Sequence, residues 1–248
     1  MAFPAVQTTN TTGGNSAATN KACNLPASIA AGDLLLLIIR SAGTGGNVDT
    51  HTTPQGWSDL VKNNLDDGSD DTTSIFYKQA AGDEGASVTV NGTASLKFAS
   101  LSWRISGHEN PALQAPEIST AATGTSTTPQ PNAISPAGGA KDFLFLWIGG
   151  WEGEQTSPPA SNPTDYTSNI IGANSGVGGA TATNCRCASA SRQANVTTET
   201  PGSWTISASE DWTAWVVVIF PSTVVPLVEE QYQPQKQTLP DDPVTVCA

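Results

Sequence analysis

The feature that most constrains the fold is an apolar run that occurs twice along the chain. In the first half, Asp33 is followed by six consecutive apolar residues, Leu34 to Ile39. In the second half, Asp142 is followed by a matching run, Phe143 to Ile148. Each run is too short for an independently stable helix and lies between turn-forming residues, which is typical of a buried β-strand. The sequence therefore predicts one equivalent buried strand in each half.

Other residues repeat with nearly the same spacing. The acidic residues that open the two runs are 109 positions apart, and so are Trp57 and Tyr166, which both follow a proline-containing turn. Lys78 and Arg192, each followed by Gln-Ala, are 114 positions apart. A glycine-rich insertion at residues 172–179 accounts for the five extra positions. This self-similarity indicates an internal duplication, with Trp57 and Tyr166 as equivalent core residues.

Composition and local alternation favour strands joined by tight turns. Only 13% of the 248 residues are charged, whereas the chain contains 23 Gly and 17 Pro. Apolar residues alternate with polar ones at Leu101, Trp103 and Ile105, with the period of two expected of a half-buried strand. Such a sequence suits helices poorly. We therefore predict an all-β protein.

The repeat divides the predicted fold into three parts. We expect two tandem antiparallel β-sandwich modules of jelly-roll or immunoglobulin-like type, at residues 1–109 and 110–221. Residues 222–248 have no repeat partner and contain four prolines, which predicts an extended C-terminal arm. Whether the two copies form separate sandwiches or one fused core is open at this stage.

Charge argues against two classes of partner. The formal net charge is −12, and the ten Lys and Arg residues form no cluster, so binding to a nucleic-acid backbone is not expected. No apolar run approaches the ~20 residues of a membrane span. The first residues, Met1 to Pro4, lack the features of a secretory signal, which predicts synthesis and folding in a cytoplasm.

Residues suited to catalysis or metal binding are few. The two histidines, His51 and His108, occupy non-equivalent positions of the first copy and are interpreted as loop residues. The four cysteines, at positions 23, 185, 187 and 247, lack the spacing of zinc ligands and are expected to be free thiols. No common catalytic motif is present. We predict no catalytic residue, no cofactor and no metal.

One loop in the second copy is a candidate ligand site. Trp151, Glu152 and Glu154 lie in a glycine-rich segment, where the ring could stack on a sugar beside two carboxylates. A glycosidase that uses Glu152 and Glu154 is a remote variant of this reading. The alternative is a glycine-rich turn with solvated acids and a Trp that packs on the end of the strand.

A second acidic loop allows two readings. Asp66, Asp67, Asp70 and Asp71 surround a Gly-Ser turn and could supply oxygen ligands to calcium. Their spacing does not match the D-x-D-x-D-G pattern, so a solvated acidic turn is the preferred interpretation.

Several segments together resemble a known class of protein. The segments are Asn24 to Leu36, Pro54 to Trp57, Phe76 to Ala80 and Ser102 to Gly107. Over about residues 4 to 221, this pattern is similar to duplicated β-sandwich structural proteins of tailed bacteriophages and prophages. The resemblance concerns scaffold residues, so it implies a virion protein and no active-site residues.

The resulting expectation is a non-enzymatic virion structural protein on the particle surface, assembled in the host cytoplasm. Capsid decoration, or cement, is the leading role, and a tail-fibre or carbohydrate-binding module is the alternative. The expected partners are copies of the same chain in a homo-oligomer, the major capsid or tail protein, and a host surface glycan. The C-terminal arm is expected to make the assembly contacts.

Overall fold

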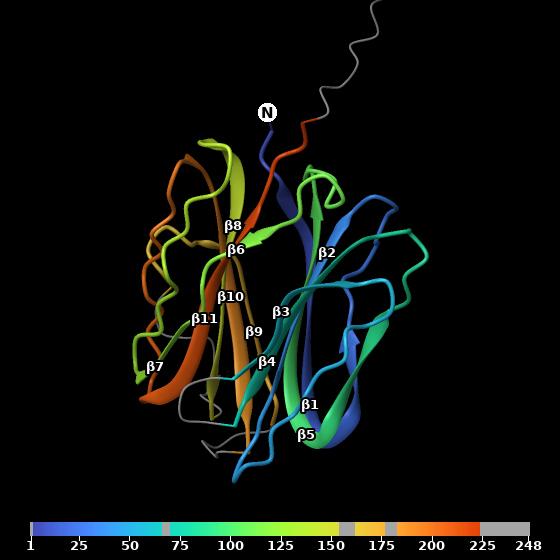
Figure 1. Ribbon diagram of the computed structural model, residues 1–248, viewed down its shortest axis with the longest axis vertical. Helices are drawn as coiled ribbons and strands as arrows, with labels where there is room; N and C mark the ends of the chain where they lie inside the picture. The colour runs from blue at the N-terminus through green and yellow to red at the C-terminus, as the bar shows by residue number, and fades with distance from the viewer. Residues whose placement is uncertain (1, 66–69, 154–161, 177–182, 224–248) are drawn as a thin grey trace, which may run out of the picture.

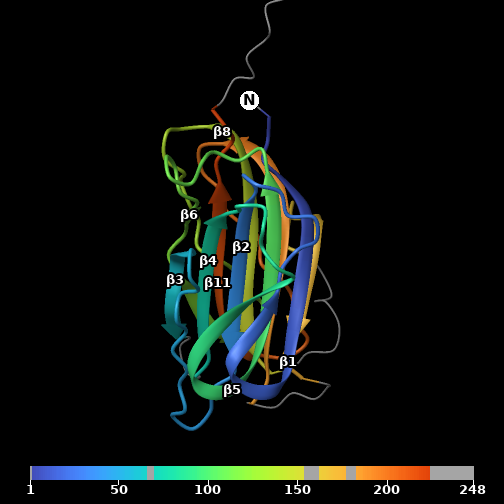
Figure 2. The ribbon, with the colours of Figure 1, turned by 90° about the vertical axis from the view of Figure 1, so that its right-hand side faces the viewer.

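The computed structural model describes residues 2–65, 70–153, 162–176 and 183–223, and it is all-β. The strands form two antiparallel sheets, which Figure 1 shows as two layers and Figure 2 shows turned by a quarter. No helix within the described ranges is long and apolar enough to cross a membrane. The all-β class and the antiparallel pairing predicted from the sequence are confirmed.

The first half of the chain builds one sheet. Its spatial order is β1-β5-β2-β4-β3. The strands are β1 (Ala5–Asn24), β2 (Leu34–Ser41), β3 (Ser58–Leu65), β4 (Thr72–Gln79) and β5 (Ser87–Ser106).

The second half builds the other sheet. Its spatial order is β6-β11-β8-β10-β9, and β7 also pairs with β11. The strands are β6 (Glu117–Ile118), β7 (Ala122–Ser126), β8 (Lys141–Glu152), β9 (Ser168–Asn174), β10 (Cys185–Val196) and β11 (Glu210–Ile219).

The two orders are the same when each strand is matched to its counterpart. The short β6 and β7 stand where β1 stands, and β11, β8, β10 and β9 stand where β5, β2, β4 and β3 stand. The pairing registers also match: Leu34 lies opposite Gln79 on β4, and Leu144 lies opposite Gln193 on β10. Leu34 and Leu144 are 110 positions apart, one more than the sequence alignment gave. That single residue decides which face of the sheet each side chain occupies.

Each half contributes one sheet to a shared core, so the two tandem modules expected from the sequence form one fused core, the arrangement left open between fused and separate sandwiches. Alternate residues of the two apolar runs, among them Leu36 and Leu146, face each other between the sheets. Cys185 and Cys187 also point into this core and are free thiols, as predicted. Burial raises the pKa of Cys187 to about 12, so this thiol is unreactive at neutral pH. The apolar runs are continuous because both of their faces are covered.

The outer face of the first sheet is covered by the sheet itself. β1 and β5 are twenty residues long, and register shifts between Gly14 and Asn20 bend the pair over the face of the sheet. The bend at the lower end of the first layer is visible in Figure 1. It brings the end of β1 back beside its beginning, where the Asn10 amide donates to the Leu25 carbonyl at 2.8 Å. Cys23, Phe76 and four other apolar residues are buried beneath this cover.

Aromatic residues fill the outer face of the second sheet. Trp147, Trp151 and Tyr166 belong to one buried cluster, and the rings of Trp147 and Trp204 meet edge to face at 5.2 Å. Tyr166 is fully buried, which confirms the core role predicted for it, whereas Trp57 is half-buried and packs against the outer cluster of the first sheet.

Candidate functional site

The ligand site predicted at Trp151, Glu152 and Glu154 does not have the exposed ring that it needs. The Trp151 side chain is 0% exposed and packs in the outer cluster of the second sheet, with the Arg186 guanidinium 5.6 Å from its ring. Glu152 is half-buried at the end of β8, and Glu154 lies outside the described residues. A buried ring offers no surface on which a sugar can stack.

The acidic loop is only partly within the described structure. Asp66 and Asp67 lie outside it, and Asp70 accepts a hydrogen bond from the Gly46 amide at 2.6 Å. Asp71 is fully buried and pairs with the Arg40 guanidinium at 3.0 Å. Across the described ranges, no group of three or more His, Cys, Asp or Glu side chains could hold a metal ion. Asp71 is therefore a core residue and not part of a solvated turn.

The two histidines lie in segments between strands, as the sequence interpretation had them, but both are buried. His108 lies at the junction of the two halves, where its Nδ1 and Nε2 atoms face the carbonyl oxygens of Glu109 and Gly32 at 2.6 and 2.9 Å. His51 lies at the outer face of the first sheet, and its Nδ1 atom is 3.0 Å from the Ser74 hydroxyl. Both side chains hold parts of the chain together.

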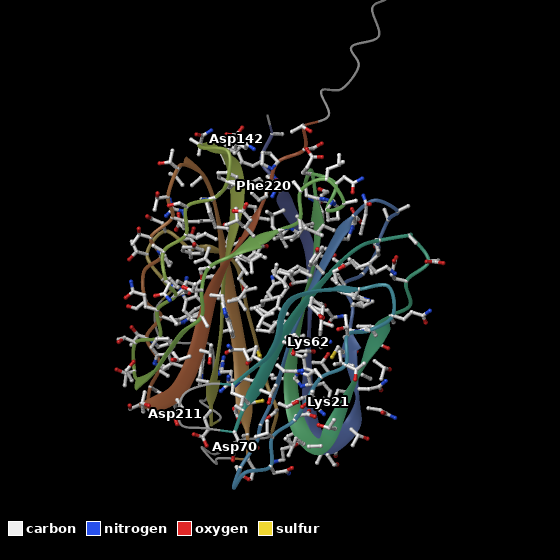
Figure 3. All side chains as sticks on the ribbon, in the orientation of Figure 1. Lys21, Lys62, Asp70, Asp142, Asp211 and Phe220 are labelled. Carbon is white, nitrogen blue, oxygen red and sulfur yellow. The ribbon has the colours of Figure 1, made fainter. Side chains whose placement is uncertain are left out.

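A cluster of polar side chains surrounds His51, and we call Lys21, Ser41, Asp49 and His51 the Lys21 cluster. Lys21 Nζ lies 2.7 Å from Asp49 Oδ2, and both side chains are 0% exposed. Ser41 donates to the same carboxylate oxygen at 2.9 Å and also lies 2.8 Å from His51 Nε2. Figure 3 shows Lys21 within the bent part of the first sheet. Four polar groups are thus concentrated where water does not reach.

The electrostatics of the cluster follow from its burial. Burial alone raises the pKa of Asp49, but hydrogen bonds from His51 and Lys21 outweigh it and hold that pKa below its usual range. Burial lowers the pKa of His51, and the adjacent Asp49 carboxylate offsets this only in part. His51 is therefore neutral at pH 7, beside an ionised carboxylate.

The cluster contains the residue types of a hydrolytic triad without its geometry. In a triad, the carboxylate orients the histidine through one ring nitrogen while the other contacts the serine. Here Asp49 and Ser41 approach the same nitrogen, His51 Nε2, at 3.4 and 2.8 Å. All three side chains are buried, so no external substrate reaches them. The cluster is not a hydrolase site.

Sequence reasoning missed Lys21, Asp49 and the ion pair of Arg40. A signal existed for Arg40, because it follows the first apolar run with the parity of Leu34, Leu36 and Ile38, which all face the shared core. No comparable signal joins Lys21 to Asp49, since these residues meet only after β1 has bent over the sheet.

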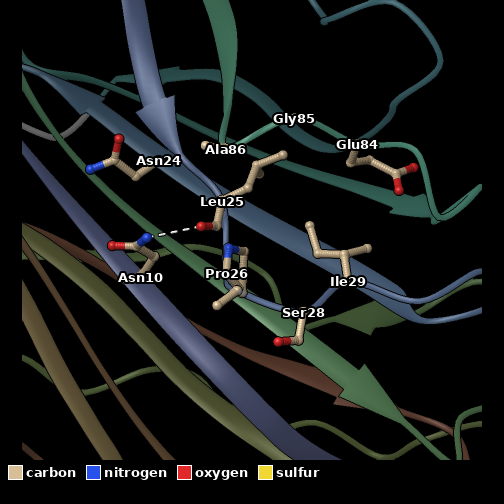
Figure 4. A pocket seen from close by; sticks show the side chains of 10 residues that line it. Asn10, Asn24, Leu25, Pro26, Ser28, Ile29, Glu84, Gly85 and Ala86 are labelled. Atoms are coloured by element: carbon tan, nitrogen blue, oxygen red, sulfur yellow. Dashed lines mark hydrogen bonds between the residues drawn. The ribbon is translucent and has the colours of Figure 1, made fainter.

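Two open grooves lie on opposite layers. The first has a volume of about 670 Å³ and lies between Asn10, the loop that begins at Leu25 and the segment Glu84 to Ala86, as Figure 4 shows. The second has a volume of about 610 Å³ and lies beside β7, with Gln130, Trp212 and hydroxyl side chains in its lining. None of the residues that line the second groove carries a charge. Its chemistry suits a neutral polar ligand.

Hydrogen bonds at the junction of the two halves fasten the chain just before residue 224. Glu109 accepts hydrogen bonds from the Asn110 amide at 2.9 Å and from the Thr223 amide at 2.8 Å, and the Thr223 hydroxyl donates to the same carboxylate. The bond from that hydroxyl is the main cause that lowers the pKa of Glu109. The Ser222 amide donates to the Gly107 carbonyl at 2.9 Å. We call these contacts the terminal clamp.

Comparison with known proteins yields no relative. No protein-family model, no curated protein and no solved structure matches the chain.

Proposed function

We propose that the protein is a non-enzymatic structural component of a tailed-bacteriophage virion, exposed on the particle and most consistent with capsid decoration. The observation that carries the proposal is the terminal clamp. Glu109, between the two halves, fixes the chain at Thr223, the last residue before the segment 224–248. If residues 224–248 bind a partner, the hydrogen bonds between Glu109 and Thr223 hold the folded body to that partner.

The matching strand orders of the two sheets support the duplication that belongs to this proposal. Equivalent glycines also face equivalent aromatic residues, since Gly14 lies opposite Phe98 and Gly124 lies opposite Trp212. The two glycines are 110 positions apart and the two aromatic residues 114, the same offsets as between β2 and β8 and between β4 and β10. Two copies of one sheet, joined face to face, account for both observations.

Partners follow from the same argument. The proposed partners are copies of this chain and a capsid or tail protein, on the surface of a particle assembled in the host cytoplasm. A net charge of −12 suits an exterior surface that stays soluble at high local concentration.

Truncation after Thr223 tests the proposal. The variant lacking residues 224–248 keeps the terminal clamp, so we expect a folded body with unchanged circular dichroism. We expect loss of the oligomer in light scattering and loss of rebinding to particles stripped of the protein. The matched variant Glu109→Gln, which weakens the clamp but keeps the segment, is expected to bind with reduced affinity. A full-length protein that remains monomeric and does not bind the particles would refute the proposal.

The second groove supports an alternative role as a tail-fibre or carbohydrate-binding module. Its neutral lining of hydroxyl and amide side chains offers hydrogen-bond donors and acceptors to an uncharged sugar. This role predicts binding on a glycan array that Gln130→Ala weakens and that Asn10→Ala, in the first groove, leaves unchanged. Equal binding by both variants, or none by the intact protein, would remove it.

A further inference from the structure

We propose that Lys21 and Asp49 condense to form an intramolecular isopeptide bond. The new bond joins Lys21 Nζ to Asp49 Cγ, one carboxyl oxygen leaves as water, and no oxidant or external reactant is needed. The two groups already lie 2.7 Å apart at 0% exposure, inside a folded protein that holds them together. Such proximity replaces the entropy cost of a bimolecular reaction. This inference is independent of the proposed virion role.

The reaction requires Lys21 to lose a proton, and Asp49 is the group placed to receive it. The Lys21 ammonium group has three N–H donors, but within the described residues it meets two acceptors, Asp49 Oδ2 and the Ala94 carbonyl at 3.2 Å. Transfer of a proton from Nζ to Oδ2 yields an uncharged amine and an uncharged acid. A desolvated lysine amine is a competent nucleophile. Since the hydrogen bonds to Asp49 favour its ionised form, the neutral pair is a minor species and the reaction is slow.

Asp49 Oδ1 is placed to carry the negative charge that develops during attack. It accepts hydrogen bonds from the backbone amides of Thr50 at 2.9 Å and Ala94 at 3.0 Å. When the amine adds to Cγ, the carbonyl electrons move to Oδ1, where these two donors stabilise them. Two fixed backbone donors at this distance form an oxyanion hole.

The other carboxyl oxygen, Oδ2, is placed to leave. His51 Nε2 lies 3.4 Å from it, and the Ser41 hydroxyl lies 2.9 Å from it. The remaining proton passes from the attacking nitrogen to the hydroxyl on Oδ2, since Nζ and Oδ2 start 2.7 Å apart, and this oxygen departs as water when the amide carbonyl re-forms. Neutral His51, protonated on Nε2, stabilises the departing oxygen together with the Ser41 hydroxyl and is unchanged at the end, so the step balances in atoms and charge. His51 is the catalytic residue in this scheme.

The backbone leaves room for both reacting groups. A Cβ atom on Gly92 would lie 2.6 Å from Lys21 Nζ and would also collide with the Asp49 carboxylate. Gly92 lies on β5, and only glycine at this position allows the amine and the carboxylate to pack together against the strand. The resulting cross-link ties the bent end of β1 to the loop that precedes β3, in a protein whose described cysteines are free.

Intact mass spectrometry of the denatured full-length protein tests the proposal. Loss of one water lowers the mass by about 18 Da relative to the sequence, allowing for removal of Met1. The deficit is expected to grow during incubation of the folded protein at neutral pH. Trypsin is expected to release residues 2–40, uncut after Lys21, joined to residues 41–62. Lys21→Met is expected to have the full mass, whereas the matched control Lys62→Met, on the exposed edge of β3, keeps the deficit.

A variant of His51 tests the mechanism, and the unmutated protein provides a result that does not depend on whether a variant folds. His51→Ala is expected to slow the mass loss about 100-fold. Should Lys21→Met fail to fold, the mass and tryptic map of the unmutated protein still decide the question. An incubated, folded protein with the full mass and separate tryptic peptides 2–21, 22–40 and 41–62 would overturn the proposal and leave an ordinary buried ion pair.

Discussion

The two halves place different chemistry at matching positions of their two sheets. In the first half, Ser41 on β2 and Ser74 on β4 face outward into the Lys21 cluster. At the offsets of 110 and 114 positions, their counterparts are Trp151 and Ala188, which belong to the aromatic cluster. One outer face is closed by hydrogen bonds and the other by aromatic packing. The two sheets thus keep the same strand order and a common apolar core, although the residues on their outer faces differ in chemistry.

The cover over each face explains how this difference is possible. In the first half, the bent ends of β1 and β5 bring Lys21 and the Ala94 backbone over the sheet, which supplies partners for polar groups. In the second half, the position of β1 is taken by the short β6 and β7, and residues such as Tyr166 and Trp204 close the face. A face covered by apolar residues cannot satisfy buried hydroxyls, so it favours Trp and Ala there.

The largest expected effect comes from truncating the side chain at this shared position. Trp151→Ala is expected to lower the free energy of unfolding by about 3–5 kcal/mol, because it removes a fully buried indole. Ser41→Ala, its counterpart, is expected to cost about 1–3 kcal/mol through the hydrogen bonds that it removes from Asp49 and His51. Urea unfolding followed by circular dichroism measures both. A negligible loss in Trp151→Ala would show that the ring is not a core residue.

A smaller effect is expected where each half places a glycine against an aromatic ring. An added Cβ would collide with the Phe98 ring at Gly14, and at Gly124 it would lie 2.9 Å from the Trp212 ring. Gly14→Ala and Gly124→Ala are each expected to lower the unfolding free energy by about 1–3 kcal/mol. Gly85→Ala, whose added Cβ would make only an ordinary contact of 3.9 Å with the Ser87 carbonyl oxygen, is the control and is expected to be nearly neutral. If only one of the two pairs responds, the halves are less alike at this point than their registers indicate.

The smallest effect is a difference in response to acid. The pKa of buried His51 is lowered, so the unfolded chain binds its proton first, and the first half loses stability as the pH falls through about 6.5. Burial raises the pKa of Glu199 in the second half, so that group contributes stability at low pH that is lost as the pH rises. The sign for His51 does not depend on the proposed cross-link, since loss of the Asp49 charge lowers its pKa further.

Unfolding at pH 7 and pH 5 separates these two contributions. We expect the protein to be less stable at pH 5, the loss to shrink in His51→Gln, and the loss to grow in Glu199→Gln. Equal losses in all three proteins would show that neither group titrates differently on folding.

The sequence predicted the parts of the fold that depend on local pattern. Leu34 to Ile39 and Phe143 to Ile148 are buried strands because a continuous apolar run is covered on both faces. The repeated sequence pattern led to matching positions in the two sheets, although it placed β8 one residue away from the observed register. The sharing of one core by both halves could not be predicted, since it depends on how whole sheets pack.

The site predictions failed where burial depends on distant segments. Trp151 lies in a glycine-rich stretch typical of an exposed loop, but Trp204 and its neighbours cover the same face from more than fifty positions away. His51 likewise follows a glycine-rich segment and is buried by the bend of β1. Local composition reports which residues favour a turn, and it does not report what packs over that turn.

One contact across the shared core has a consequence for the chain as a whole. Arg40 and Gly150 are counterparts in the two halves, and a Cβ on Gly150 would lie 2.6 Å from the Arg40 side chain. Two copies of the first half would place two arginines in the space for one, and two copies of the second would leave that space empty. Each half is therefore complementary to the other and not to itself. We expect a chain cut between Asn110 and Gln114 to regain its β-structure only when both unlike fragments are mixed, which circular dichroism of the separate and mixed fragments would check.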